Sequence, residues 1–128
     1  MDVASVPAGA GSQDPLIGDL RRGGLLQLLI LHFVGQEPRY GNQLIDQISA
    51  LTAGALTINP NTMYPLLRKL EAQGLVQGAW EHPERRSRRF YAITPAGAAE
   101  REALHAEVMP RLERIGRSIG SIQEELDA

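Results

Sequence analysis

The feature that most constrains the fold is the run Leu25–Val34, in which eight of ten residues are apolar. A helix that is apolar nearly all round must be covered by other elements on several sides. The apolar pattern extends back to Leu16 and ends at Gly35. We therefore predict one buried helix over 16–34. His32, which lies within it, is expected to be a core histidine with a local hydrogen bond.

A second helix is predicted to follow Tyr40-Gly41. Its apolar residues recur at offsets of one, four and seven from the first, so they form one stripe on a helix surface. We expect a surface helix whose stripe alone faces the core. The stripe consists of Leu44, Ile45, Ile48 and Leu51.

A third helix is predicted to begin at Asn59-Pro60, because Asn is a favoured N-cap and Pro suits the first helical position. The helix should run to Gln73, with Gly74 as its C-cap. Pro65 cannot donate to the carbonyl of the preceding turn and should bend the first turn. Four apolar residues fall together on a helical wheel and should face the core: Met63, Leu66, Leu67 and Leu70.

A hairpin and a long helix complete the chain. Leu75–Glu81 and Arg89–Ile93 are predicted as β segments, separated by the charged tip His82–Ser87. Thr94-Pro95 again supplies an N-cap and a first-position proline, which open a last helix. Pro110 should kink that helix. The predicted organisation is a flexible tail over 1–15, one domain over 16–94 and a terminal helix over 95–128.

The last helix carries apolar residues at spacings of 4, 3, 4, 3 and 4, which is a heptad seam. The seam could fold back on the first helix, but a small domain leaves little else to cover it, so a homodimer is favoured. Gly116 and Gly120 weaken the last turns, which then need a partner. The predicted dimerisation residues are Val108, Leu112, Ile115, Ile119, Ile122 and Leu126.

Charge is distributed unevenly along the chain. The formal net charge is −2, yet residues 59–91 carry six basic and three acidic side chains, a balance of +3. The flanking segments 1–58 and 92–128 are both acidic overall. A local basic patch is what contact with phosphates requires.

The element order of three helices, a hairpin and a long helix predicts a winged helix-turn-helix, mainly α with a small β-hairpin wing. In that fold the third helix enters the major groove and the wing reaches phosphates or the minor groove. Double-stranded DNA is therefore the predicted partner. The predicted contacts are Asn61, Thr62, Tyr64, Arg68 and Lys69 on the helix, and Arg85, Arg86, Arg88 and Arg89 on the wing.

The segment Asn61–Leu75 resembles the recognition-helix signature of the PadR family of transcriptional regulators, and Arg89–Gly97 resembles the family's second wing strand and the start of its dimerisation helix. The resemblance spans about residues 20–100 and is closest to the shorter subfamily. It implies a bacterial cytoplasmic repressor that binds inverted-repeat operators as a homodimer. Two alternatives are open for its control: release by a small hydrophobic effector bound at the dimer interface, or simple autoregulation with no effector. Some short members hold flat drugs between terminal-helix tryptophans. Here the sole tryptophan is Trp80, in the hairpin, where wing packing is the favoured role.

Other classes have less support. The chain has no cysteine, which excludes disulfides and thiolate metal sites and fits a reducing compartment. No membrane span or signal peptide is recognisable. No grouping of catalytic residues or phosphate-binding loop is present, so neither an enzyme nor a cofactor or metal site is predicted. The alternative function is a winged-helix protein-interaction adaptor that does not bind DNA.

Overall fold

The computed structural model describes residues 15–128, without the side chains of residues 15–17 and 85–87. The predicted fold class is confirmed, because the chain is mostly helical with a small antiparallel sheet and a long C-terminal helix. The predicted tail over 1–15 lies outside the described residues except for Pro15. The elements are α1 (Pro15–Leu20), η2 (Arg21–Leu25), α2 (Leu26–Gln36), β1 (Arg39–Tyr40), α3 (Gly41–Leu51), α4 (Pro60–Ala72), β2 (Val76–His82), β3 (Arg85–Ile93) and α5 (Pro95–Asp127).

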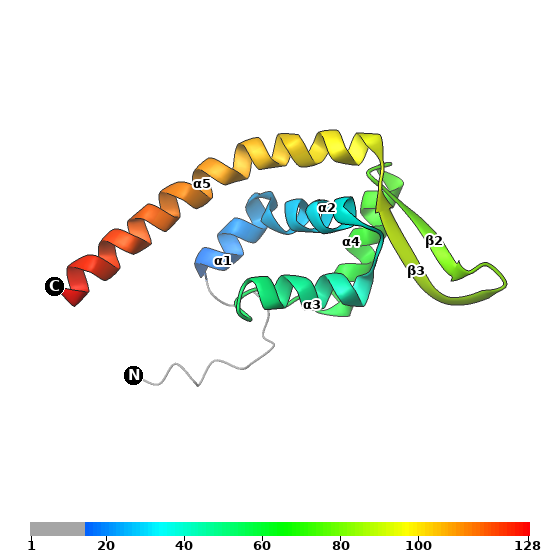
Figure 1. Cartoon of the computed structure of the whole chain (residues 1–128), viewed down its shortest axis with the longest axis horizontal. Coiled ribbons are helices and arrows are strands. Elements are labelled where there is room, and N and C mark those ends of the chain that lie inside the picture. Colours follow the sequence, from blue (N-terminus) through cyan, green and yellow to red (C-terminus); the bar gives the residue numbers. More distant parts are fainter. Residues whose placement is uncertain (1–14) are drawn as a thin grey trace.

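The predicted first helix is not continuous, which corrects the expectation of one helix over 16–34. It is divided into α1, the π-helical segment η2 and α2, and Gly24 takes a φ of 101° inside η2. That conformation suits glycine, which has no Cβ to clash with the backbone. The break lies against α5, since a Cβ on Gly24 would be 3.1 Å from Leu104 Cδ2. In Figure 1, α5 lies along η2 and α2.

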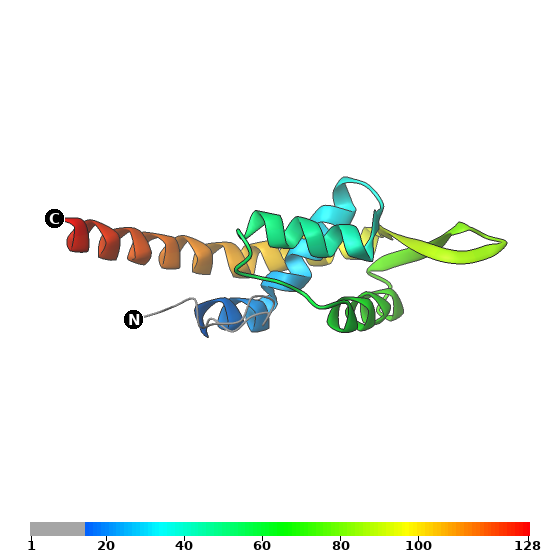
Figure 2. The ribbon, with the colours of Figure 1, turned by 90° about the horizontal axis from the view of Figure 1, so that it is seen from below.

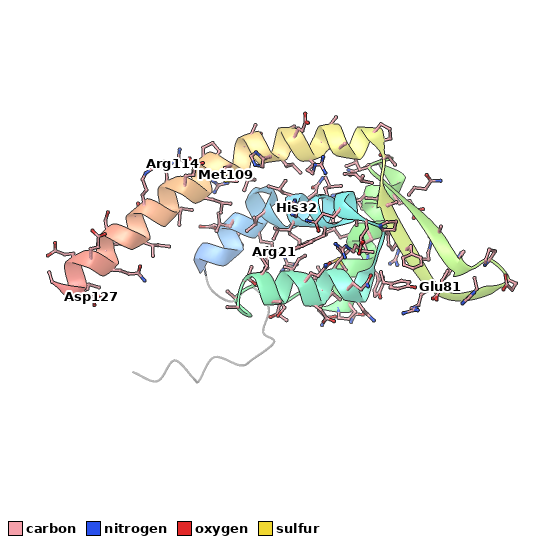
Figure 3. The ribbon with its side chains drawn as sticks, viewed as in Figure 1. Arg21, His32, Glu81, Met109, Arg114 and Asp127 are labelled. Carbon is pink, nitrogen blue, oxygen red and sulfur yellow. The ribbon has the colours of Figure 1, made fainter. Side chains whose placement is uncertain are left out.

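Helix α2 forms the centre of the core, as predicted from its composition. Ile30 and Leu31 are fully buried and Val34 is nearly so. His32 is exposed, however, so its expected place in the core was wrong. Its Nε2 lies 3.3 Å from Gln36 Nε2, one turn further along α2. Labels in Figure 3 show His32 on this helix.

The third helix begins and ends as predicted. The Asn59 side chain accepts a hydrogen bond from the Asn61 amide at 2.7 Å, and Pro60 is the first helical residue. At the other end, Gly74 has a φ of 77°. The amides of Gly74 and Leu75 donate to the carbonyls of Glu71 and Leu70, which is the Schellman arrangement. Helix α4 runs without interruption through Pro65.

The sheet has the order β1-β3-β2, with both pairings antiparallel. The two-residue strand β1 was not predicted, because it is too short for an alternating pattern. The predicted six-residue tip was also wrong, since β2 extends to His82 and β3 begins at Arg85. Only Pro83 and Glu84 turn the chain, so most of the charged segment belongs to the strands.

Helix α5 is 33 residues long and begins at the predicted cap, where the Thr94 side chain accepts from the Gly97 amide at 3.0 Å. The helix continues through Pro110, and it changes direction near the labelled Met109 in Figure 3, as the proline predicts. Its C-terminal half and the wing project from opposite ends of the molecule (Figure 2). Across residues 15–128, no helix is both long and apolar enough to cross a bilayer.

Candidate nucleic-acid interface

Helix α4 divides sharply into a buried and an exposed side. Met63 and Leu67 are fully buried and Leu70 is 1% exposed. These three residues anchor α4 to the main core cluster that includes α2 and α3. The opposite side is open to solvent and consists of Asn61, Thr62, Pro65, Arg68 and Lys69. The helix is therefore held by its apolar side and presents two amide or hydroxyl groups and two cations outward.

Tyr64 lies between these two sides. The ring is half-buried and packs against the core cluster, and its hydroxyl donates to Asn42 Oδ1 at 3.0 Å. The ring also covers Gly41, where an added Cβ would lie 2.6 Å from Tyr64 Cε1. Tyr64 thus joins α4 to the first turn of α3, and only part of its surface remains available to a ligand.

Arg88 and Glu81 face each other across the wing. The Glu81 carboxylate accepts from Arg88 Nε at 2.8 Å and from Arg88 Nη2 at 3.1 Å, a bidentate pair. The hydrogen bond from Arg88 lowers the pKa of Glu81 below its usual value. The Arg88 guanidinium also lies 4.0 Å from the centre of the Tyr40 ring, which stacks on Phe90. Figure 3 labels Glu81 on the wing.

Arg89 is turned towards α4. Its Nη2 donates to Glu71 Oε2 at 2.9 Å, and its side chain is only 28% exposed. Two of the four wing arginines predicted to contact DNA are therefore paired with carboxylates of the same chain. The backbones of Arg85 and Arg86 begin β3, directly after the turn, and their side chains lie outside the described part of the structure.

A recess of about 620 Å³, lined by both charged and aromatic residues, lies between α3, α4 and the wing. It places Arg68 of the recognition helix beside the wing arginines 88 and 89, with Asn42 from the first turn of α3. Four aromatic rings also line it, from β1, α4 and the wing strands: Tyr40, Tyr64, Trp80 and Tyr91. The recess brings the two predicted DNA-reading elements onto one continuous surface.

Sequence reasoning missed the residues that hold this surface together. Glu71 and Glu81 are the partners of the wing arginines, and Asn42 is the partner of Tyr64. Glu81 could have been found from the sequence, because it ends the first predicted β segment and Arg88 directly precedes the second, only seven residues away. Glu71 and Asn42 carry no such signal, since their partners lie 18 and 22 residues away.

The heptad seam of α5 is divided between two environments. Val108 is 2% exposed and packs within the same chain on Leu20, Leu25 and Leu28. Leu112 and Ile115 are partly buried against that same cluster. Ile119, Ile122 and Leu126 are 43%, 58% and 78% exposed. The sequence left open whether the seam folds back on the first helix or forms a dimer. The first half of the seam folds back, so Val108 is not accessible to a partner.

Comparison with known proteins agrees with this geometry. Residues 30–103 match the Transcriptional regulator PadR-like family. The chain is 35% identical over 74 residues to the Transcriptional regulator Rv3488 of Mycobacterium tuberculosis, covering 58% of this chain and 66% of the relative. It is 32% identical over 99 residues to the Transcriptional regulator YqjI of Escherichia coli, covering 77% of this chain and 46% of the relative. The chain thus spans about half to two thirds of the length of these relatives.

A solved structure extends the likeness beyond the matched segment. The crystal structure of a PadR family transcriptional regulator from Eggerthella lenta superposes with a TM-score of 0.62 at 31% sequence identity. The superposition covers 81% of this chain and 88% of that structure. The matched family segment contains α3, α4 and the whole wing. The chain belongs to the PadR-like family of transcriptional regulators.

Proposed function

We propose that this chain is a homodimeric, sequence-specific repressor that binds an inverted-repeat operator through α4 and the wing. The observation that carries the proposal is the exposed side of α4, where Arg68 and Lys69 stand opposite a fully buried Met63 and Leu67. Arginine and lysine bind guanine edges or phosphates, and Asn61 and Thr62 offer groups suited to base edges. The local positive charge of residues 59–91 favours the same ligand.

Genomic DNA fragments of the source organism are first selected by retention on the immobilised protein. The test then measures the affinity of each variant for these duplexes. Arg68→Ala is expected to weaken operator binding about 5- to 100-fold, the cost of one base-reading or phosphate contact. Lys69→Ala should behave similarly. Arg85→Ala and Arg86→Ala should weaken binding to all duplexes and lower the slope of log affinity against log salt by about one each.

The matched control is Arg114→Ala, which removes the same charge from an exposed position on α5 (Figure 3). It should leave operator affinity unchanged. If the four interface variants also bind as wild type, the proposed surface is wrong. If the wild-type chain shows no salt-dependent retention on any duplex, the adaptor function is favoured instead.

Dimerisation is proposed to use the projecting half of α5. Its exposed residues Ile119 and Ile122 continue the seam that begins at the buried Val108. A two-fold dimer would bury this stripe and place two α4 helices about 34 Å apart, the spacing of successive major grooves. Ile122→Glu should shift the chain towards monomer in sedimentation. Ser121→Glu, which adds the same charge off the stripe, should not, and equal behaviour of the two variants would contradict the assignment.

Release by a small hydrophobic effector is also proposed. The supporting feature is an apolar groove of about 460 Å³ between α2 and α5, lined by Leu28, Met109 and Leu112 among others. Leu112 lies on the seam two turns before Ile119, so a ligand there would lie next to the proposed dimer interface. Trp80 lies on the wing and does not line this groove. A hydrophobic ligand should raise the melting temperature of wild type but not of Met109→Glu, and equal shifts would count against this groove.

A further inference from the structure

Glu71 connects the recognition helix to both strands of the wing. Its Oε2 accepts from Arg89 Nη2 of β3 at 2.9 Å and from the Gly78 amide of β2 at 3.1 Å. Strand β2 is at the edge of the sheet, so its outward amides have no neighbouring strand to bond. The single carboxylate therefore satisfies an edge amide and holds the guanidinium of the adjacent strand.

The position of Glu71 is not explained by helix formation. It lies in the last turn of α4, two residues before the C-cap Gln73. A negative charge there opposes the helix macrodipole and so does not favour the helix. The two contacts with the wing supply a reason for a carboxylate at this place in the sequence.

The residues around Arg89 hold its side chain in the conformation that reaches Glu71. Its guanidinium crosses over Gly78, where a Cβ would lie 2.6 Å from Arg89 Nη2. The Trp80 and Tyr91 ring centres lie 5.4 and 5.7 Å from its Cζ. Its Nε is buried and has no hydrogen-bond partner among the described residues. The side chain lines the recess, is only 28% exposed and donates to Glu71 through its Nη2.

We propose that Glu71 and Arg89 form a strut that fixes the angle between the wing and the recognition helix, and that Arg89 is a positioning residue and not a phosphate ligand. This inference rests on the proposed DNA-binding function. A two-stranded ribbon is marginally stable by itself. The strut holds one side of the ribbon to α4, while Arg88, Tyr40 and Phe90 join its other side to β1. A wing fixed in advance loses less conformational freedom when it binds.

Salt dependence distinguishes a strut from a phosphate ligand. A lost phosphate contact lowers the slope of log affinity against log salt by about 0.9. We expect Arg89→Ala to weaken operator binding severalfold without changing that slope. Glu71→Ala should have the same effect, although it removes a negative charge, which would otherwise strengthen binding to DNA. The double variant should bind no more weakly than either single variant, because each already breaks the same contact.

Three further variants sharpen the test. Gly78→Ala leaves both charges in place but pushes the Arg89 guanidinium aside, and should weaken binding as Glu71→Ala does. Glu71→Gln keeps the side-chain length and an acceptor oxygen but removes the charge. It should therefore fold and show an intermediate loss of operator affinity. Glu113→Gln, an exposed carboxylate on α5, is the matched control and should bind as wild type.

Hydrogen exchange of the Gly78 amide, measured without DNA, separates the strut from the proposed function. The amide should exchange faster in Glu71→Ala than in wild type. If wild type binds no duplex, the proposed function fails. The exchange rate of the Gly78 amide then remains as the test of its contact with Glu71. If wild type binds DNA and Arg89→Ala lowers the salt slope by about one, or Glu71→Ala binds the operator as tightly as wild type, the strut is overturned.

Discussion

Gly97 lies where the end of α4, the end of the wing and the start of α5 meet. Its amide donates to Thr94 Oγ1 at 3.0 Å, and the Thr94 hydroxyl donates to the Gly74 carbonyl at 2.6 Å. The Thr94 amide donates to the Leu75 carbonyl at 3.2 Å. A Cβ on Gly97 would overlap that carbonyl oxygen and lie 2.9 Å from its carbon. We predict that Gly97→Ala destabilises the chain.

The magnitude follows from the space available. The distance of 2.9 Å is about 0.5 Å short of ordinary carbon–carbon contact, and the obstructing group is backbone. Such overpacking costs about 1–3 kcal/mol. Disturbing the Thr94 cap adds about 1 kcal/mol, and the lower entropy of the unfolded alanine chain offsets about 0.4–1 kcal/mol. The net loss of about 1–3.6 kcal/mol should lower the melting temperature by roughly 4–14 °C for a chain of this size.

The matched control is Gly116→Ala, the same substitution in the same helix. No atom lies within 4 Å of the Cβ it would add. Alanine should therefore raise stability at this position by about 0.5–1 kcal/mol, because it favours the helix. Thermal unfolding followed by circular dichroism, with all proteins at one concentration, compares the two variants. A Gly97→Ala protein as stable as Gly116→Ala would refute the packing argument.

Three further predictions concern the core and the site. Leu67→Ala should cost about 2–5 kcal/mol in denaturant unfolding, because Leu67 is fully buried; a loss below about 1 kcal/mol would contradict its anchoring role. Tyr64→Phe removes the bond to Asn42 and should cost about 0.5–1.5 kcal/mol, whereas no change would show that this partly exposed bond stabilises nothing. Burial raises the pKa of Tyr91 above 10, so its contribution to stability is full below pH 10 and is lost as pH rises through the higher folded value. Tyr91→Phe should flatten the alkaline fall in stability, and identical profiles for the two proteins would disprove this.

The termini of α4 and the start of α5 could be predicted from sequence because short-range contacts form them. Asn59 and Thr94 each accept a hydrogen bond from an amide two or three residues ahead. The two Schellman hydrogen bonds around Gly74 join residues that lie within a span of six. The buried side of α4 followed from helical spacing alone. Such features depend on neighbours that the chain order already fixes.

Tertiary structure decided which polar residues of the site remain available. Arg88 and Arg89 look alike in the sequence as charges on a wing, but the hairpin register and the approach of α4 pair them with Glu81 and Glu71. Tyr64 likewise became half-buried once α3 packed on α4. Gly24 divides the first helix where α5 passes close to it, and the same contact buries Val108. Apart from Glu81, which is seven residues from Arg88, the partners in these contacts lie far away in the chain, and the local pattern does not contain their positions.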